Sequence, residues 1–350
     1  MAMKELIITA ANSITAVGLD GAMTAASVRA GVSGFATHDD YVDQNDNPIT
    51  VAPITGIDDG NRDTSARKAL IARKCLTELL LNYFSNGARR PAKIHLFLGV
   101  SPLLRPGPRY EERCSRPLVK LLRHWSNSSS IEHVPNGNAS FHYAVDLAAH
   151  LLEGDADALC VIGGVDSLIR ESTLNWFEGA GRLKSESYGR HGGLIASEAV
   201  SFVVVEDALR AKAGGRPALA RIVRLGLAEE RNARASDASS TGTGLTEACR
   251  AVLEGTSGNA IAAVLGDLNG EASRAMEWVC ADMRCFKECL EGRRFLTPAK
   301  SYGDIGAASG GVLAVVASQG FLRGWLPSPV LAFCSDDHGS CGAVILEAPR

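Results

Sequence analysis

Two stretches of this 350-residue chain share one design, in which a glycine-containing turn leads directly into a helix rich in small residues. The first turn, at 136–138, precedes a predicted helix over 139–152. The second turn, at 302–304, precedes one over 307–317. A helix without a broad polar face is buried rather than placed on a surface. The chain must therefore fold so that two helices lie inside it, covered on both sides.

The remaining sequence alternates strands and helices in two similar halves. Strands are expected at 5–9, 94–100, 158–163 and 194–206 in the first half, and at 220–227, 261–265, 329–334 and 343–347 in the second. Such alternation predicts parallel or mixed sheets with right-handed crossovers. We expect an α/β fold of five layers, α/β/α/β/α, with two pseudo-repeated halves. Their boundaries are placed at 1–215 and 216–350, with insertions at about 38–63 and 101–133.

Composition narrows the class of protein. Apolar residues make up 46% of the chain and charged residues 21%, and the formal net charge is -3. These values are typical of a globular protein and give no electrostatic footprint for nucleic acid. The first eight residues resemble a strand rather than a signal peptide, and no apolar run is as long as a membrane span. We expect a cytoplasmic location.

The nine cysteines are odd in number and irregular in spacing, which argues against a disulfide framework and favours a reducing compartment. Cys280, Cys285 and Cys289 are close in sequence, but their spacings match no zinc pair. We interpret them as structural or surface residues. No metal and no cofactor is predicted.

Several motifs occur in an order that resembles a known family. They are Ala-Gly-Val-Ser-Gly at 30–34, a strand ending in Gly-Gly at 163–164, the segment 193–200 around Ser-Glu-Ala, and Lys-Ser through Gly-Asp to Ser-Gly at 300–310. Together they resemble the β-ketoacyl synthases, which are condensing enzymes of the thiolase fold. The resemblance spans nearly the whole chain and implies a thiolase-like fold.

The resemblance also implies a site, at which this chain departs from the family. In β-ketoacyl synthases a cysteine at a helix N-terminus attacks the acyl thioester, and two histidines stabilise the developing charge. The helix dipole lowers the pKa of such a thiol, and imidazole donors hold an oxyanion. Here the matching positions hold Asn138, Asp267 and Asp304. The match at Asp267 could be displaced by two residues. An amide forms no acyl ester or thioester.

Each of these residues also has an ordinary interpretation. Asn138 fits a helix N-cap, with ligand binding as the alternative. Asp267 and Asp304 fit helix caps or buried hydrogen bonds, with new acid–base chemistry as the alternative. Asn269 and His338 are further candidates for the pocket, and His338 also fits an ordinary turn residue.

Several cysteines, histidines and basic residues are further candidates for reaction or binding. A nucleophile pair of Cys334 or Cys341 with His338 stays open. His133 and His142 flank the turn at Asn138, and we interpret His142 as packed. A basic run could receive an acidic carrier protein, although a solvated face is the simpler interpretation. It consists of Arg105, Arg109, Arg113, Arg116, Lys120 and Arg123.

We therefore predict a catalytically silent β-ketoacyl synthase-like protein that acts through binding. It would be an accessory subunit, such as an adaptor or chaperone for a type VI secretion effector. The alternatives are an active acyl-transferring enzyme of the 3-oxoacyl-carrier-protein synthase type with altered catalytic residues, or the non-catalytic partner of a ketosynthase. Expected partners are a second copy or a related chain in a dimer, and an effector or acyl carrier protein. No nucleic acid or membrane partner is expected.

Overall fold

The computed structural model describes residues 4–57, 65–85, 90–102, 111–155, 157–184, 192–233, 240–255, 260–286 and 293–350. Within them, strands of the two halves follow the same plan. In the first half the neighbouring strands are, in order, β1 (Leu6–Ile14), β7 (Ala196–Asp207), β6 (Leu159–Ser167), β4 (Lys93–Gly99) and β5 (Ser128–Val134). In the second half they are β8 (Ala220–Glu229), β12 (Ser340–Glu347), β11 (Val330–Ser335), β9 (Ala263–Gly266) and β10 (Arg294–Leu296).

Pairing directions repeat as well. In the first half β4 runs parallel to β5 and β6, and β7 is antiparallel to β6 and β1. In the second half β9 runs parallel to β10 and β11, and β12 is antiparallel to β11 and β8. The halves join where Leu6–Ile8 pairs with Ala220–Ile222. The predicted pseudo-repeat is therefore present in the strand order itself.

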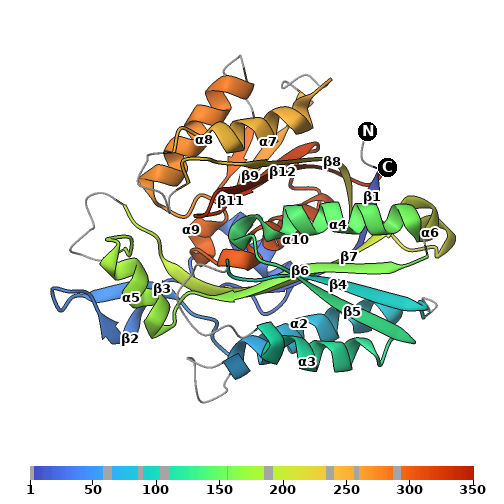
Figure 1. Cartoon of the computed structure of the whole chain (residues 1–350), viewed down its shortest axis with the longest axis horizontal. Helices are drawn as coiled ribbons and strands as arrows, with labels where there is room; N and C mark the ends of the chain where they lie inside the picture. Colours follow the sequence, from blue (N-terminus) through green and yellow to red (C-terminus); the bar gives the residue numbers. More distant parts are fainter. Residues whose placement is uncertain are drawn as a thin grey trace.

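The two small-residue helices lie in the middle layer, as Figure 1 shows. They are α4 (Ser140–Gly154) and α10 (Ser309–Leu322), which follow the short 3-10 turns η1 (Gly137–Ala139) and η3 (Gly306–Ala308). α10 is buried continuously from Ser309 through Ser318 and contacts strands of both halves. Apolar burial on all sides explains why this helix needs no polar face.

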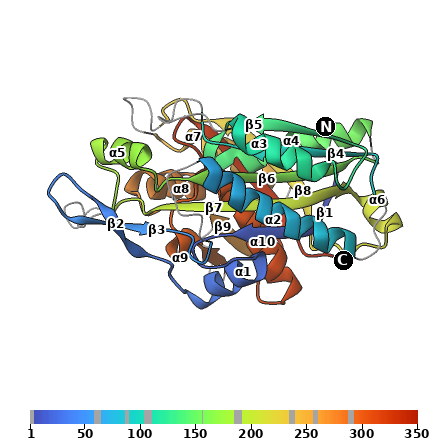
Figure 2. The same cartoon turned by 90° about the horizontal axis from the view of Figure 1, so that it is seen from below.

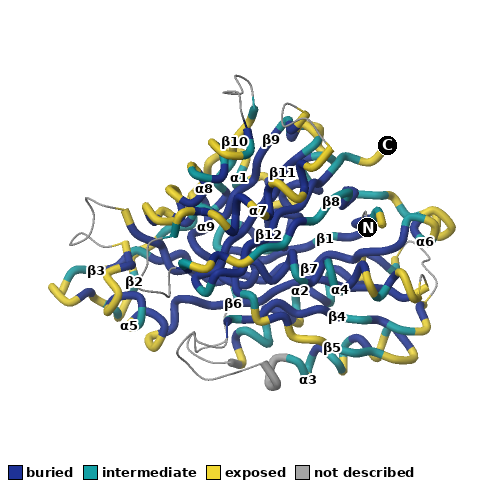
Figure 3. Tube along the Cα trace, turned by 45° about the horizontal axis from the view of Figure 1, so that its top comes forward, coloured by how far each residue is buried: buried dark blue, intermediate teal, exposed yellow. Residues whose placement is uncertain are grey.

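The outer layers are amphipathic helices. α2 (Ser65–Ser85) and α3 (Glu111–Leu122) cover the first half, and α7 (Thr243–Leu253) and α8 (Ala272–Cys285) cover the second (Figures 1 and 2). Together with the middle helices and the strands of the two halves they give the five predicted layers. Figure 3 shows the burial that results, with dark central strands and exposed outer turns.

The remaining elements lie at the edges. α1 (Gly21–Ala30) begins after Asp20, whose side chain accepts from the amide of Met23, and it ends at the C-cap Gly31 with φ 70°. The predicted insertion at 38–63 contains β2 (Ala36–Val42) and β3 (Pro48–Ala52), which pair with each other; β3 also pairs with β7. This hairpin and α5 (Glu171–Gly179) form the arm on the left of Figure 1.

Two short helices complete the described elements, α6 (Ala208–Ala213) and α9 (Ala299–Tyr302). The domain boundary at 215–216 falls between α6 and β8 and stays a prediction. No described helix has both the length and the hydropathy needed to cross a membrane.

Glycines at 163 and 164 allow β6 to lie against its neighbours. A Cβ on Gly163 would stand 2.1 Å from the carbonyl oxygen of Ser201 on β7, and one on Gly164 would stand 2.0 Å from that of Ala307 in η3. Backbone atoms cannot yield as a flexible side chain can. The Gly-Gly motif therefore fixes the distance between this sheet and the start of the buried helix α10.

We expect Gly164→Ala to lower the free energy of unfolding by roughly 1 to 3 kcal/mol, because the added methyl overpacks against backbone. Gly154→Ala is the matched control, since nothing lies within 4 Å of its Cβ position at the end of α4. Urea unfolding of both variants checks this. Equal stability of the two variants would contradict the packing argument.

Candidate functional site

The first turns of the two central helices meet at Asn138. This residue lies in η1, just before α4, and is buried. Its amide nitrogen donates to Asp304 Oδ1 at 3.2 Å and to the hydroxyl of Ser309, the first residue of α10, also at 3.2 Å. The two positions that the sequence marked as departures, 138 and 304, are thus in direct contact across the two halves.

Asp304 is held on every side. Its backbone amide donates to Ile195 O at 2.8 Å, which ties it to the start of β7. Besides Asn138, Oδ1 accepts from the amide of Gly306 at 2.9 Å, and Oδ2 accepts from Asn269 Nδ2 at 2.8 Å. Both carboxylate oxygens are therefore engaged, which suits a structural role better than a free general base.

Asn269 connects Asp304 to a buried ion pair. Its Nδ2 also donates to Glu271 Oε2 at 2.9 Å, and its Oδ1 accepts from the Glu271 amide at 3.1 Å. Arg182 holds Glu271 through both Nε and Nη2, at 2.9 and 2.8 Å, and reaches Asp337 Oδ2 at 2.7 Å. Burial alone would lower the pKa of Arg182, but its bonds to these two carboxylates raise it.

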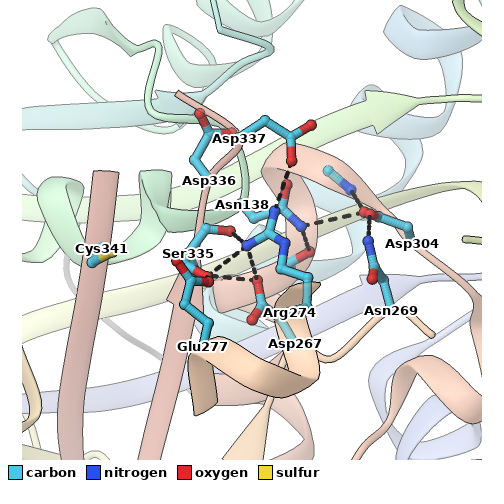
Figure 4. Close-up of polar contacts among 12 residues, drawn as sticks. Asn138, Asp267, Asn269, Arg274, Glu277, Asp304, Ser335, Asp336, Asp337 and Cys341 are labelled. Atoms are coloured by element: carbon cyan, nitrogen blue, oxygen red, sulfur yellow. Dashed lines mark hydrogen bonds and ion pairs between the residues drawn. The ribbon is translucent and has the colours of Figure 1, made fainter. Parts of the chain in front are cut away.

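A second buried arginine lies at the centre of Figure 4. Arg274, near the start of α8, donates to the backbone carbonyl and hydroxyl oxygens of Ser335. It also contacts Asp337 Oδ1 at 3.3 Å and lies 3.9 Å from Asp267 Oδ2. Ser335 in turn donates to Glu277 Oε2 at 2.7 Å. Carboxyl groups from three parts of the chain thus surround this guanidinium: Asp267 after β9, Glu277 on α8 and Asp337 after β11.

The pKa of Asp267 is strongly raised. Burial raises its pKa from 3.8 to about 7, the charge of Arg274 opposes the rise, and the charge of Asp304 adds to it. Oδ2 accepts from the Ser335 amide at 3.3 Å, whereas Oδ1 is buried and accepts from no nitrogen or oxygen donor among the described residues. A neutral, protonated carboxyl fits this position better than a carboxylate.

The cluster as a whole has more acids than cations. Six acidic side chains and two arginines are buried here: Asp267, Glu271, Glu277, Asp304, Asp336 and Asp337, with Arg182 and Arg274. The carboxylate of Asp304, in contact with Asn138, opposes the formation of a thiolate or an oxyanion at that position. The geometry therefore supports a rigid polar joint and disfavours the charge development that acyl transfer requires.

The structure divides the candidate residues predicted from the sequence into two groups. Asn138, Asn269 and Asp304 form one hydrogen-bonded chain, whereas Asp267 joins through Arg274 and Ser335. Of Asp267 and Asn269, which are two residues apart, Asn269 is the one in contact with Asp304. The N-cap interpretation of Asn138 is wrong, because α4 has no side-chain cap bond and the Asn138 amide donates across the site instead.

The other reactive candidates are a turn residue, two buried thiols and a packed imidazole. His338 lies in the turn between β11 and β12, where its amide donates to Asp336 Oδ2 at 2.9 Å. Burial raises the pKa of Cys334 and Cys341 well above the ordinary thiol range, so both stay protonated. His142 is packed as expected, and burial lowers its pKa to about 4.

Two predicted groups lie partly outside the described residues. Cys289 is outside them, Cys280 and Cys285 are half-buried on α8, and no metal-binding group occurs in the described part of the chain. Of the basic run, Arg105 and Arg109 are outside, as is the side chain of Arg113. The members that are described, Arg116, Lys120 and Arg123, line a cleft of about 630 Å³ with His133.

Sequence reasoning missed the two arginines. Arg182 follows α5 in a segment without a motif, and its partners are 89 and 155 residues away. Arg274 follows the segment Asp267–Glu271, and that acidic segment was the one available signal, since buried acids require cations.

Comparison with known proteins agrees with this architecture. No protein-family model matches the chain, and no curated protein sequence is significantly similar. Solved structures do match. A type II polyketide ketosynthase in complex with its acyl-carrier protein has a TM-score of 0.79 at 12% identity, over 99% of this chain and 100% of that one.

Two further structures extend the comparison. The ishigamide ketosynthase/chain length factor has a TM-score of 0.77 at 14% identity, covering 100% of both chains. A β-ketoacyl synthase from Burkholderia phymatum has a TM-score of 0.75 at 18% identity, over 99% of this chain and 100% of that one. The chain therefore has the thiolase-like fold of the ketosynthases, as the sequence motifs predicted.

The buried carboxyl of Asp267 predicts a pH-dependent stability. Because the folded protein holds this proton up to pH about 7 while the ordinary value is 3.8, the free energy of unfolding falls as pH rises between these values. The expected loss is about 1 kcal/mol per pH unit. Asp267→Asn removes this slope but keeps the shape of the side chain.

Urea unfolding of both proteins from pH 4.5 to 8 checks the prediction. The difference between the two profiles isolates Asp267 from other groups, such as His142, whose lowered pKa gives the opposite slope in acid. We expect the wild type to lose stability relative to Asp267→Asn up to pH about 7 and no further above it. Parallel profiles would show that Asp267 is ionised throughout.

Proposed function

We propose that this protein is a ketosynthase-like binding subunit that forms no acyl-enzyme at residue 138. The observation that carries the proposal is the contact between Asn138 and Asp304 at the tips of the two central helices. A side-chain amide has no nucleophilic sulfur or oxygen comparable to a thiolate. The neighbouring carboxylate supplies negative charge where acyl transfer needs hydrogen-bond donors.

The described cysteines offer no substitute at this site. The pKa of each fully buried thiol is raised. Burial is the main cause for Cys75, Cys160, Cys334 and Cys341, and the hydrogen bond with Cys285 is the main cause for Cys249. The pKa of Cys285 is lowered, chiefly by its bond with Cys249, but Cys285 lies at the end of the outer helix α8, whereas Asn138 lies in the middle layer. These facts favour binding over the alternative of a condensing enzyme with altered catalytic residues.

A partner chain of the same fold is the binding role with most support. One similar structure is a ketosynthase/chain length factor pair, and another holds an acyl-carrier protein. In this chain β5 ends the strand order of the first half and pairs with β4 alone among the described strands. An open edge strand is a natural site for a second chain. The role of secretion-effector adaptor stays a prediction.

Sedimentation velocity tests this pairing. We expect a dimer, either of the chain alone or after mixing with a ketosynthase encoded beside it, because pairing would cover the β5 edge. A monomer under both conditions would argue against the accessory-subunit role.

Incubation with an acyl-CoA thioester tests the absence of covalent chemistry. We expect the intact mass to stay unchanged, because residue 138 provides no group to accept the acyl chain. An active β-ketoacyl synthase of the same fold serves as the positive control. A stable adduct on any cysteine or serine of this chain, formed with release of free CoA, would overturn the proposal.

A pair of variants tests the electrostatic part. Asn138→Cys places a thiol beside Asp304, whose charge raises the thiol pKa. Adding Asp304→Asn removes that charge with little change of shape. We expect Cys at 138 to react with iodoacetamide at pH 7 about tenfold faster in the double variant, since one pKa unit changes the thiolate fraction tenfold. Peptide mass spectrometry distinguishes alkylation at position 138 from alkylation of the native cysteines. Equal alkylation rates in the single and double variants would contradict the electrostatic argument.

A further inference from the structure

A second feature lies at the opposite end of α10, away from the Asn138 site. A cleft of about 580 Å³ opens between α1 and the segment that follows α10. α1 packs against α10, and both lie at the lower edge of Figure 2. Because α10 has 14 residues, its two ends are about 20 Å apart. Nothing in the proposed function depends on this cleft.

The α1 side of the cleft is smooth. Ala22, Ala26 and Ala30 line it at intervals of four residues, so they lie on one face of the helix, and all are exposed. Without larger side chains, this face allows the backbone of another helix to approach closely. α1 spans 10 residues, or about 15 Å, which matches about three turns of a docked helix.

The rim of the cleft is cationic. Arg29 and Arg323 line it, and neither forms an ion pair with a carboxylate among the described residues. Arg29 lies 6.0 Å from the ring of Trp325, and Arg294 lies 5.9 Å from the same ring and donates to the Trp325 carbonyl at 2.8 Å. No acidic residue lines the cleft. The positive charge of Arg29 and Arg323, which have no carboxylate partner among the described residues, favours an acidic partner.

Apolar side chains flank this cationic rim on both helices. Met23 on α1 is 50% exposed, and Leu322 at the end of α10 is 60% exposed. Each is adjacent in sequence to a residue that lines the cleft. The alanine face beside arginines that have no carboxylate partner among the described residues matches a ligand that has both a nonpolar stripe and negative charge.

We propose that the cleft between α1 and the end of α10 binds an acidic amphipathic helix of a partner protein. The nonpolar stripe of that helix packs on the alanine face and against Met23 and Leu322. Its carboxylates pair with Arg29 and Arg323 on the rim. The arrangement is a helix in a groove, in which apolar contacts give affinity and charge gives orientation.

A designed peptide serves as the probe. It is a fluorescein-labelled, lactam-stapled 16-residue helix with a leucine and alanine stripe bordered by glutamates, and its control carries lysine at every glutamate. We expect the acidic peptide to bind the wild-type protein in 50 mM salt with micromolar affinity by fluorescence anisotropy. The lysine peptide is expected to bind at least tenfold more weakly, because like charges face each other.

Variants locate the binding. Arg29→Glu combined with Arg323→Glu reverses the rim charge, and Ala26→Trp fills the alanine face; each is expected to weaken binding at least tenfold. Lys120→Glu with Arg123→Glu, at and just beyond the C-terminal end of α3, is the matched charge control and leaves binding unchanged. Circular dichroism and thermal unfolding verify that all variants are folded, since every substituted side chain is exposed.

Three results would overturn the proposal. These are no binding of the acidic peptide to folded wild-type protein at low salt, equal binding of the lysine peptide, or binding that the α3 variant abolishes and the rim variant does not. Binding to anionic vesicles instead of the peptide would also overturn it. None of these results bears on acyl transfer at residue 138, so the two proposals fail independently.

Discussion

The hydrogen bond between Asn138 and Asp304 lies where the two halves of the molecule meet. Each residue precedes one of the buried central helices, and each helix is covered by sheets on both sides. Buried polar groups at such a point must be satisfied, because water cannot reach them. The amide and the carboxylate satisfy each other, and Ser309 and Asn269 complete the chain. This joint fixes how the tips of α4 and α10 lie against each other.

Charge at this joint is the physical basis for proposing that it forms no acyl-enzyme. Arg182 and Arg274 pair with buried acids of the network, and burial raises the pKa of Asp267 to about 7. A fold that condenses acyl groups needs a thiolate and donors for an oxyanion at the same place. The network instead gives a buried site whose hydrogen bonds are largely internal.

Much of the fold could be predicted from the sequence because packing dictates composition. A helix between two sheets must be small and apolar, and a strand that contacts backbone on its face must carry glycine, as at Gly164. The three-residue strand β10 and the short helix α5 were missed, since neither has a clear period.

The site was predicted less completely. Asn138 and Asp304 were found because motifs flank them. The side chains of Asn269 and Asp267 could not be distinguished, because a shift of two residues in a loop leaves the motif unchanged. Arg182 reaches partners far away in sequence, and only tertiary packing brings them together.

The most direct test of this account is a double-mutant cycle between residues 138 and 304. The single variants Asn138→Ala and Asp304→Ala, the double variant and the wild type are unfolded in urea, and the coupling free energy is taken from the four values. The account predicts a favourable coupling of about 0.5 to 3 kcal/mol, as measured for residues in one hydrogen-bonded network. Additive effects would show that the two side chains do not interact, and would contradict the joint on which the proposed function depends.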